Sequence, residues 1–416
     1  MRVAIVGAGI VGITSAYELA ASGHQVQVFE RHSSVAAEAS FGHAGLIGAD
    51  HLMLPPLGGA DDPRWRHLGA HAEGLRWVGT AALRHAPWLW QRWRSGRAAV
   101  HGAHRQAMQS LAQFSRDRLL ALTRTLQLGH EQTPGLLVLL RNARETQKAR
   151  QALKPLIDSG LSFELVDATR CRQIEPALHA DTALHAGIFW PHDGVGNCRL
   201  FAHQLKAQAQ ALGAHFQFDT AVQQVLPGAR PAVKTADQQR HEFDAVVLCT
   251  GARARLLLMD LSLRLPLLSV SGYSVTAPLR HLEGLPPLAP RSAVIDQGVV
   301  ISRLGQRVRV SGGAELGGYA GRIDAATLRR LYRVLNDWFP GAALTHQAQH
   351  WKGARPTLPD GLPVLGASGA PGVWLNLGHG ATGWAMACGS ALVLAEMLAG
   401  RAAPLDMLGL RLARFR

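Results

Sequence analysis

A glycine-rich loop carrying one histidine lies near the C-terminus, in the stretch NLGHGATGWAMACGS from Asn376 to Ser390. Histidine titrates near neutral pH, so it can act as a general base, and it is also a common metal ligand. Glycines placed just before an apolar helical run are equally typical of a loop whose N–H groups face an anion. The stretch by itself leaves three interpretations open: a catalytic histidine, a metal site or an anion-binding loop.

A second glycine pattern, G-x-G-x-x-G at residues 7–12, lies between an apolar run and a helical run near the N-terminus. In such a turn Gly7 permits a sharp bend, Gly9 lets the backbone approach a pyrophosphate, and Gly12 lets the helix pack on the strand. Glu30 ends the next apolar run, where a carboxylate accepts hydrogen bonds from a ribose. The pattern predicts a dinucleotide site, and the acidic residue favours NAD or FAD over NADP although an arginine follows it.

The cysteines and histidines do not form a metal-binding motif. The histidine pairs at 67 and 71 and at 101 and 104 have helical spacing, but neither has the glutamate of an H-E-x-x-H motif or an evident third ligand. We therefore expect no metal. The cysteines are too far apart for C-x-x-C chemistry and are predicted to be buried free thiols; they are Cys171, Cys198, Cys249 and Cys388.

Apolar periodicity predicts the elements that position these residues. Strand Arg2–Val6, helix Ile13–Ala21 and strand Gln25–Glu30 form a β-α-β unit around the first glycine motif. Residues 64–155 are predicted to be mostly helical, with the clearest amphipathic helix over residues 106–126. Further along the chain the predicted elements are helix Leu200–Leu212, strands Phe216–Val225 and Phe243–Cys249, antiparallel sheet over residues 266–318, helix 325–338, and a strand, loop and helix from residue 373 onward.

This order of elements predicts an α/β protein. A discontinuous Rossmann-like dinucleotide-binding domain is interrupted by an inserted α+β domain built on an antiparallel sheet. The first domain is expected to comprise residues 1–60, 196–265 and 350–416. The inserted domain is expected to comprise residues 61–195 and 266–349 and to provide the substrate side of the site.

The positive charge of the chain is concentrated in one region. Residues 64–154 contain 16 lysines and arginines against four acidic residues, and so carry +12 of the net +14, together with five of the ten tryptophans. Interleaved basic and aromatic residues suit an anionic membrane surface or a nucleic-acid groove, and they also occur on an ordinary solvated helical face. No apolar run looks long enough to span a bilayer. We expect a cytoplasmic protein, with peripheral contact at the cytoplasmic face of the inner membrane as a further hypothesis.

Several longer stretches resemble one family of flavoproteins. AVVLCTGA at residues 245–252, ASFGHAGLI at residues 39–47 and the stretch from Trp351 to Gly366 resemble the D-amino-acid oxidase superfamily. The resemblance is strongest, and runs end to end, for the bacterial FAD-dependent D-amino acid dehydrogenases of the small-subunit type. The stretches that carry it are EPAL at 175–178, GYSVT at 272–276, RVSGGAE at 309–315 and LNLGHGATGWAMACGS at 375–390.

That resemblance implies non-covalent FAD and the oxidative deamination of a D-amino acid to a 2-oxo acid and ammonia. The α-hydrogen passes as a hydride to flavin N5, and the electrons pass to a quinone, an electron-transfer protein or another acceptor rather than chiefly to oxygen. The alternative on the same fold is an enzyme acting on glycine, sarcosine or a proline derivative. An FAD-containing RNA-binding protein is a rival class, but no aromatic RNA-recognition motif is visible, so we expect no nucleic-acid partner.

The resemblance also implies the roles of individual residues. Arg355 is expected to bind the substrate carboxylate through its planar guanidinium, Tyr273 to assist the carboxylate or cover the substrate, and His379 to lie beside the flavin pyrimidine; Tyr319 is a weaker candidate for a lid. His379 as a general base is the minority interpretation. The residues expected to contact FAD are Val6, Gly7, Ala8, Gly9, Ile10, Val11, Gly12, Glu30, Arg31, Ser40, Ala44, Gly45, Leu46, Val222, Thr250, Gly251, Gly353, Gly378, His379, Gly380, Thr382 and Gly383.

Three positions depart from the family pattern. His43 stands where asparagine is usual, Leu46 where glutamine is usual, and Ser271 where lysine is common; the chain also ends early. These departures concern the identity of the substrate more than they affect the flavin site.

Overall fold

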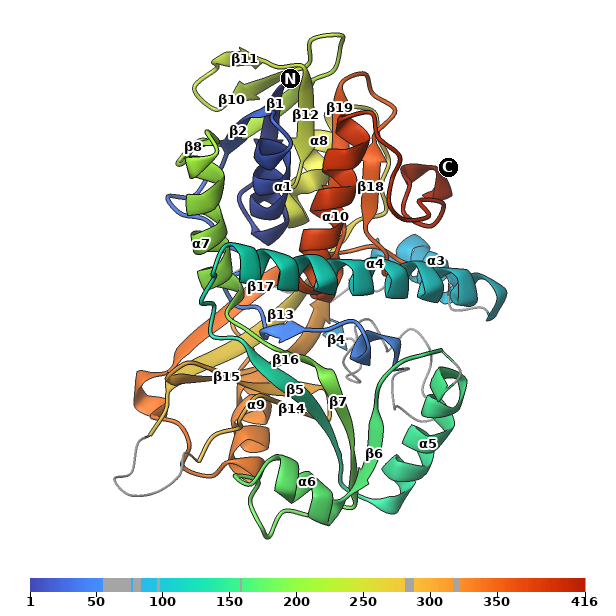
Figure 1. The fold of residues 1–416 in the computed structure, drawn as a ribbon, viewed down its shortest axis with the longest axis vertical. Coiled ribbons are helices and arrows are strands. Elements are labelled where there is room, and N and C mark those ends of the chain that lie inside the picture. Colours follow the sequence, from blue (N-terminus) through green and yellow to red (C-terminus); the bar gives the residue numbers. More distant parts are fainter. Residues whose placement is uncertain are drawn as a thin grey trace.

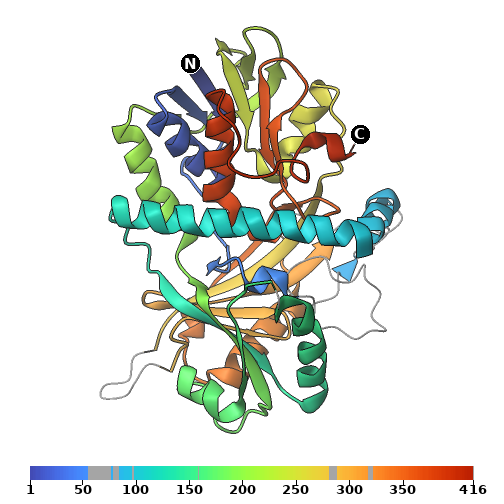
Figure 2. The ribbon, with the colours of Figure 1, turned by 45° about the vertical axis from the view of Figure 1, so that its right-hand side comes forward.

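The computed structural model describes residues 1–54, 76–77, 84–95, 98–157, 159–280, 288–316 and 322–415. Two sheets dominate it, and the long helix α4 (Ala98–Thr125) runs between them (Figures 1 and 2). The N-terminal strand and the C-terminal helix α10 belong to the same half of the molecule, although nearly the whole chain separates them. The cavity described below is formed by loops from both halves.

The first sheet has six strands in the order β18-β19-β12-β1-β2-β8. From β19 to β8 the strands are parallel, and β18 is antiparallel to β19. Strand β1 has the sequence RVAIV and its last four residues are buried, as expected for a strand covered on both faces. The strands are β1 (Arg2–Val6), β2 (Gln25–Phe29), β8 (His215–Gln217), β12 (Ala245–Leu248), β18 (Val364–Ala367) and β19 (Val373–Leu377).

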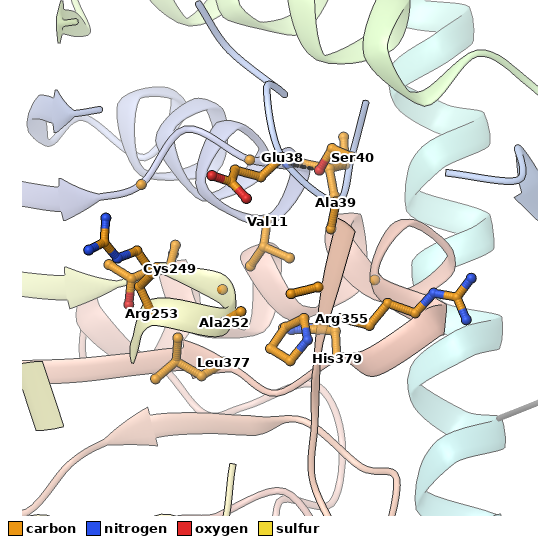
Figure 3. A pocket seen from close by; sticks show the side chains of 18 of the residues that line it. Val11, Glu38, Ala39, Ser40, Cys249, Ala252, Arg253, Arg355, Leu377 and His379 are labelled. Atoms are coloured by element: carbon orange, nitrogen blue, oxygen red, sulfur yellow. Dashed lines mark hydrogen bonds between the residues drawn. The ribbon is translucent and has the colours of Figure 1, made fainter. Parts of the chain in front are cut away.

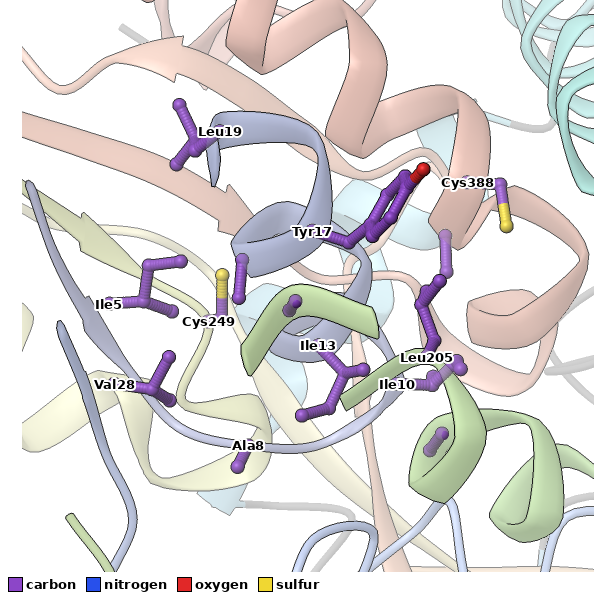
Figure 4. Close-up of a cluster of buried hydrophobic side chains, with 14 of the residues drawn as sticks. Ile5, Ala8, Ile10, Ile13, Tyr17, Leu19, Val28, Leu205, Cys249 and Cys388 are labelled. Carbon is purple, nitrogen blue, oxygen red and sulfur yellow. The ribbon is translucent and has the colours of Figure 1, made fainter. Parts of the chain in front are cut away.

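Helices cover one face of this sheet. Helix α1 (Ile10–Ala21) packs against α7 (Cys198–Ala211) and α10 (Gly383–Leu398), and α4 packs against α10. The apolar side chains between them form one buried cluster, which includes Ile5, Ile13, Leu205 and Cys388 (Figure 4). On the other face, helix α8 (Ala254–Asp260) shares a second cluster with strand β9 of a small antiparallel sheet; that sheet consists of β9 (Val222–Leu226), β10 (Ala232–Thr235) and β11 (Arg240–Glu242).

The second sheet has ten strands and is largely antiparallel. Its main path is β17-β13-β16-β15-β14-β5-β7-β3, with β4 pairing β16 and β6 pairing β7. Two of its pairings are parallel, β14 with β5 and β16 with β4. The strands are β3 (Leu46–Ile47), β4 (Arg76–Trp77), β5 (Thr133–Leu140), β6 (Glu164–Asp167), β7 (Ala186–Val195), β13 (Leu268–Pro278), β14 (Ala293–Asp296), β15 (Val299–Leu304), β16 (Arg307–Leu316) and β17 (Gln349–Thr357).

Shorter helices complete this half of the molecule. Helix α9 (Ala325–Trp338) begins at Asp324, whose side chain accepts a hydrogen bond from the Thr327 N–H, and it packs on β13, β15 and β16. Its buried side chains join those of the sheet strands in one apolar cluster. The remaining helices are α3 (Ala86–Ser95), α5 (Ala143–Ile157) and α6 (Ala168–Ile174).

Most of the predicted elements are confirmed to within a few residues, including the β-α-β unit, helix 325–338 and the final strand, loop and helix. The strand predicted over Phe216–Val225 is wrong, because the chain forms two short strands there, β8 and β9, which belong to different sheets. The mostly helical interpretation of residues 64–155 missed β5, which pairs with β7 and β14 inside the large sheet. Its apolar run LLVLL is buried and carries no helical alternation.

Some elements do not follow the predicted division into domains, and helix α4 and strand β17 are the two longest of them. Helix α4 falls in the segment assigned to the inserted domain, yet Leu119 and Leu122 are buried in the cluster of the first sheet. Strand β17 falls in the segment assigned to the first domain, yet it forms the edge of the ten-stranded sheet beside β13. Both elements lie at the junction between the two halves, and the exact domain limits remain a prediction.

The four cysteines are free and buried, as predicted. The segment Gly380–Leu398 does have the length and apolar composition of a membrane span, contrary to the expectation from sequence, but 67% of it is buried inside the protein. Figure 1 shows it as the helix packed between α1, α4 and the first sheet. Its apolar character is therefore explained by packing in the core.

Candidate active site

A cavity of about 450 Å³ lies where the carboxyl ends of the first sheet meet the edge of the second sheet. Its walls come from the β1–α1 turn, the loop of residues 38–46, the loops before β9 and after β12, strand β17 and the loop before α10. Figure 3 shows Arg253 and Arg355 at opposite ends of this cavity, with Val11, Leu377 and His379 between them. Loops at the carboxyl ends of parallel strands are where α/β proteins bind their ligands.

The three glycines of the β1–α1 turn are required for different reasons. Gly7 has φ +102°, and a Cβ atom there would lie 2.7 Å from the Cys249 carbonyl oxygen. A Cβ on Gly12 would lie 1.9 Å from the Gly7 oxygen, so this glycine permits the helix to pack. A Cβ on Gly9 would touch only Ser40 Oγ, at 3.6 Å, so no protein group requires a glycine at this position. The bare backbone of Gly9 faces the cavity, as a pyrophosphate-binding turn needs.

Ser40 lies at the N-terminus of helix α1. Gly9 is the N-cap residue and has no side chain to cap the helix, and the Ile10 N–H donates instead to Ser40 Oγ at 3.0 Å. A hydroxyl that accepts from this amide can also donate toward an oxygen in the cavity. The helix terminus and the hydroxyl together form an anion-binding position.

Glu30 follows strand β2, and its carboxylate is buried. One oxygen accepts from the Ala8 N–H at 2.7 Å and the other from the His32 N–H at 3.0 Å. These bonds hold the carboxylate beside the glycine turn, and each oxygen keeps a lone pair for a further donor. Arg31 also lines the cavity and pairs with Glu38 on the neighbouring loop.

His379 is buried in the loop before α10, where its Nε2 lies 3.2 Å from Ser390 Oγ. Burial lowers the pKa of His379 to about 3, so the imidazole stays neutral at physiological pH. A histidine with this pKa is a poor general base. In the described part of the chain no group of three or more metal-ligand side chains includes it. Gly378 and Gly380 adopt positive φ on either side of it and shape the loop.

Arg355 is on strand β17, opposite Val270 of β13, and its side chain lies over Gly272. Its Nη1 donates to the Gly313 carbonyl oxygen at 3.3 Å. His43 is half-buried close to it, and desolvation together with the Arg355 charge lowers the pKa of His43 to about 4. Nδ1 of this neutral imidazole accepts from the Gly45 N–H at 3.1 Å, so Nε2 carries the proton and faces the Ala381 carbonyl oxygen at 3.3 Å.

The structure places Tyr273 differently from the prediction. Its side chain is buried and does not line the cavity, and its hydroxyl donates to Glu315 Oε2 at 2.6 Å. The other Glu315 oxygen pairs with Lys352 Nζ, also at 2.6 Å, in an ion pair that is about 95% buried on both sides. Burial, and then this bond to Glu315, raise the pKa of the Tyr273 hydroxyl. The phenol is therefore held by a buried ion pair and is not part of the cavity wall.

Of the remaining predicted site residues, most line the cavity and four do not. Tyr319 lies outside the described residues. Those that do not line the cavity are Ala8, Gly12, Gly45 and Gly353, of which Gly353 packs against the Trp351 ring. Those that line it, besides Arg355 and His379, are Val6, Gly7, Gly9, Ile10, Val11, Glu30, Arg31, Ser40, Ala44, Leu46, Val222, Thr250, Gly251, Gly378, Gly380, Thr382 and Gly383.

His51 and Asp193 form a buried pair that was not among the predicted site residues. His51 Nδ1 lies 2.6 Å from Asp193 Oδ2, and the Asp193 carboxylate also accepts from the N–H groups of residues 49, 50 and 51. Burial raises the pKa of Asp193, but the interaction with His51 and the hydrogen bonds from the backbone outweigh it, so the pKa is lowered. His51 lines the cavity, and its Nε2 has no hydrogen-bond partner among the described residues. No sequence motif connects two residues 142 positions apart, so only the fold shows the pair.

Two further polar atoms at the cavity wall are buried without a partner in the described chain. They are Thr250 Oγ1, just after β12, and Asn376 Oδ1, near the end of β19. Buried polar atoms are normally hydrogen-bonded, so unsatisfied ones along a cavity indicate that a polar ligand completes them. With the glycine turn, Ser40 and Glu30, they provide the polar groups that a dinucleotide needs.

Comparison with known proteins agrees with this geometry. The family model described as FAD dependent oxidoreductase matches residues 2–397. A D-amino acid dehydrogenase of Cereibacter sphaeroides is 36% identical, and the alignment covers 100% of this chain and 95% of that protein. D-amino acid dehydrogenases of Allorhizobium ampelinum and Bradyrhizobium diazoefficiens are 33% and 34% identical, each with 100% of this chain and 99% of the relative covered.

Solved structures share the fold at lower identity. Glycine oxidase from Geobacillus kaustophilus aligns with a TM-score of 0.73 at 22% identity, covering 99% of this chain and 98% of the other. L-proline dehydrogenase from P. horikoshii aligns with a TM-score of 0.74 at 18% identity, covering 100% of this chain and 97% of the other. At such identities the likeness establishes a common fold.

Proposed function

The chain belongs to the FAD dependent oxidoreductase family, and from that premise we propose that it deaminates D-amino acids oxidatively to 2-oxo acids and ammonia. FAD is the cofactor of this family. The substrate class is supported by full-length relatives that are named D-amino acid dehydrogenases and are 33–36% identical.

Residues of the cavity fit the two ends of FAD. The β1–α1 turn and Ser40 would hold the pyrophosphate, and Glu30 would accept hydrogen bonds from the adenosine ribose. The loop before α10 would meet the flavin, with His379 neutral beside it. When bound, FAD supplies the hydride acceptor, and the protein supplies orientation and electrostatics.

The observation that carries the proposal is the position of Arg355. Arg355 is on strand β17, and its guanidinium lies at the end of the cavity away from the β1–α1 turn. The guanidinium donates a hydrogen bond to the Gly313 carbonyl oxygen, which fixes its position. A planar guanidinium binds a carboxylate with two parallel hydrogen bonds, which orients the α-carbon as well as holding the substrate. His43 beside it is neutral, so it does not add a second positive charge.

The pair of His51 and Asp193 supplies a proton acceptor for the substrate. The amine must lose a proton before its α-carbon can release a hydride, and a histidine held by a carboxylate is a suitable base. Asp193 accepts from Nδ1 and so leaves the Nε2 lone pair available. The carboxylate also stabilises the imidazolium once the proton has moved. In this proposal Arg355 binds the carboxylate and His51 takes the proton from the amine.

The test is reduction of the bound flavin. The purified protein is expected to show a flavin absorption spectrum that D-alanine bleaches under anaerobic conditions, with formation of a 2-oxo acid and ammonia. Arg355→Ala should raise KM strongly while flavin stays bound, and Arg355→Lys should recover only part of the affinity. Reduction by glycine, sarcosine or proline but not by D-alanine would contradict the proposal and support the alternative on the same fold.

For the electron acceptor and location we propose a quinone or an electron-transfer protein, reached at the cytoplasmic face of the inner membrane. The support is helix α3, where Trp90 and Trp93 are 55% and 42% exposed and the Arg94 guanidinium lies over the Trp90 ring. Exposed indoles beside arginines suit a membrane interface. Co-sedimentation with anionic liposomes should fall in the W90A/W93A variant, and equal sedimentation with neutral liposomes would contradict the proposal.

A further inference from the structure

A second cavity, of about 420 Å³, lies on the other side of the loop that contains Phe41 and His43. It is bounded by the first turn of α7, the ends of β13 and β16 and the segment before β17. The residues assigned to FAD and to the substrate do not line it. It is therefore separate from the cavity described above.

The charged side chains that line this second cavity are all basic in the described chain: Arg199, Arg307 and Arg309. One carboxylate lies nearby, that of Glu131, which is 3.6 Å from Arg307 Nη2 and accepts from Asn197 Nδ2 at 2.8 Å. Three guanidinium groups against one carboxylate leave a local charge of about +2. Like charges gathered in a recess are unfavourable unless an anion joins them.

Two of the three arginines, Arg309 and Arg199, are held in place by neighbours other than an acid. Arg309 is buried, and it donates from Nε to Thr276 Oγ1 and from Nη1 to the His43 carbonyl oxygen, both at 2.8 Å. The Arg199 guanidinium lies 4.6 Å from the centre of the Phe41 ring. Its Nε is buried and has no hydrogen-bond partner among the described residues. These contacts preorganise the donors before any ligand binds.

The N-terminus of α7 adds to the positive potential. This helix has 14 residues, begins after Asn197, and directs its first turn, with Arg199 and Leu200, into the cavity wall. The positive end of its dipole favours an anion near the first turn. Gln347 and Gln349 line the opposite side and offer uncharged amide donors.

We propose that the second cavity binds a small dianion, namely a phosphate group, either as inorganic phosphate or on a phosphorylated metabolite. A phosphate monoester carries close to two negative charges at neutral pH and presents three acceptor oxygens. This matches the excess charge of the cavity and the forked donors of its arginines. Burial and the neighbouring Arg307 charge already lower the pKa of Arg309 to about 10, which a bound anion would reverse.

The shared loop connects this site to the flavin cavity. Ser40 and His43 line the first cavity, whereas Phe41 between them lines the second. Arg309 joins the two directly through its bond to the His43 carbonyl. A phosphate held by Arg199 and Arg309 would therefore fix the loop on which Ser40 caps helix α1, and we expect it to change the environment of the flavin.

Binding of inorganic phosphate and of glycerol 3-phosphate to the flavin-loaded protein can be measured by calorimetry at constant ionic strength. Saturable binding is expected, with a loss of affinity of tenfold or more in Arg199→Gln and in Arg307→Gln. Arg329→Gln, which changes an exposed arginine of α9 outside the cavity, is the matched control and should bind as the parent does. Flavin content shows that each variant is folded.

Equal phosphate binding in all variants, or no saturable binding to the parent protein, would overturn the site. Tight binding of succinate with no binding of either phosphate compound would overturn the choice of ligand. A shift of the flavin absorption band at saturating phosphate supports the connection through the shared loop, and an unchanged spectrum overturns that connection. None of these measurements uses an amino-acid substrate, so their outcome is independent of the proposed deamination.

Discussion

The guanidinium group of Arg355 lies across Gly272, so close that a Cβ atom on this glycine would come within 2.2 Å of Nη2. The two residues are on adjacent antiparallel strands, where Gly272 pairs with Gly353 and Arg355 pairs with Val270. The absence of a side chain at residue 272 thus decides where the arginine can lie. The position of the proposed carboxylate-binding group depends on a glycine that touches neither substrate nor cofactor.

We expect Gly272→Ala to displace Arg355 and to raise KM for a D-amino acid by roughly one to two orders of magnitude, as loss of a charge-assisted contact does. The flavin spectrum should not change. Gly129→Ala is the control, because a Cβ there meets nothing within 4 Å and φ is not positive. Steady-state kinetics with D-alanine check this, and an unchanged KM in the Gly272 variant would contradict the assigned role of Arg355.

Substitutions of Gly9 and of Gly12 in the β1–α1 turn should have different effects, one on FAD binding and the other on stability. Gly9→Ala is expected to fold normally, because its Cβ meets only Ser40 Oγ at 3.6 Å, but to lose FAD affinity, since the methyl group faces the pyrophosphate position. Gly12→Ala is expected to lower stability itself, because its Cβ would lie 1.9 Å from the Gly7 oxygen. Flavin content and thermal unfolding of the flavin-free proteins distinguish the two. Equal loss of stability in both would contradict this assignment.

His51→Asn should lower kcat/KM for a D-amino acid by about 10²–10⁴, the usual contribution of a general base, with FAD retained. Asp193→Asn removes the carboxylate that orients the imidazole and is also expected to lower kcat/KM. If His51→Asn left kcat/KM for a D-amino acid unaltered, His51 would be excluded as the proton acceptor.

Tyr273→Phe is expected to leave KM nearly unchanged, because its hydroxyl is bonded to Glu315 outside the cavity. The cost should be about 1–2 kcal/mol of unfolding free energy, that of one buried hydrogen bond to a charge. Glu315→Gln should cost more, about 3–5 kcal/mol, because it removes the carboxylate from a buried ion pair with Lys352. Denaturant unfolding measures both, and a large rise of KM in Tyr273→Phe would restore the tyrosine to the substrate site.

Stability should fall as the pH is lowered below about 6.5. In the folded protein the pKa of His43 is lowered to about 4 and that of His379 to about 3, mainly by burial. The unfolded chain binds these protons near pH 6.5, so it takes up more protons than the folded state as the pH falls. Acid therefore lowers the free energy of the unfolded state relative to the folded state. The loss is expected between pH 6.5 and 3. Urea unfolding at several pH values should show a shallower dependence for His379→Gln, and exposed His215→Gln should keep the parent slope.

Local patterns were sufficient for the β-α-β unit and for both glycine loops, because each depends on a short run of residues. The turn at residues 7–12, the carboxylate of Glu30 and the loop at residues 378–383 all line one cavity, as those runs indicate. The same reasoning failed for β5 and for residues 216–225, where pairing with distant strands decides between helix, one strand and two.

The role of Tyr273 could not be predicted for a similar reason. Its place in the motif GYSVT indicated a strand facing the substrate, but which face of a strand meets the cavity depends on its partners. Strand β13 is paired on both edges, with β16 and β17, and a register shift falls between Ser271 and Tyr273. That irregularity lies where the tyrosine side chain turns toward Glu315.

The sequence by itself therefore determined the family, the cofactor and the glycine backbone that faces it, since these follow from residue types within short windows. The tertiary structure alone decided which side chains meet across long separations: Arg355 over Gly272, His51 against Asp193, and three arginines around a second cavity. The physical reason is that hydrogen bonds, close packing and charge act over a few ångströms. Only the folded chain brings residues that are far apart in the sequence, such as His51 and Asp193, within that range.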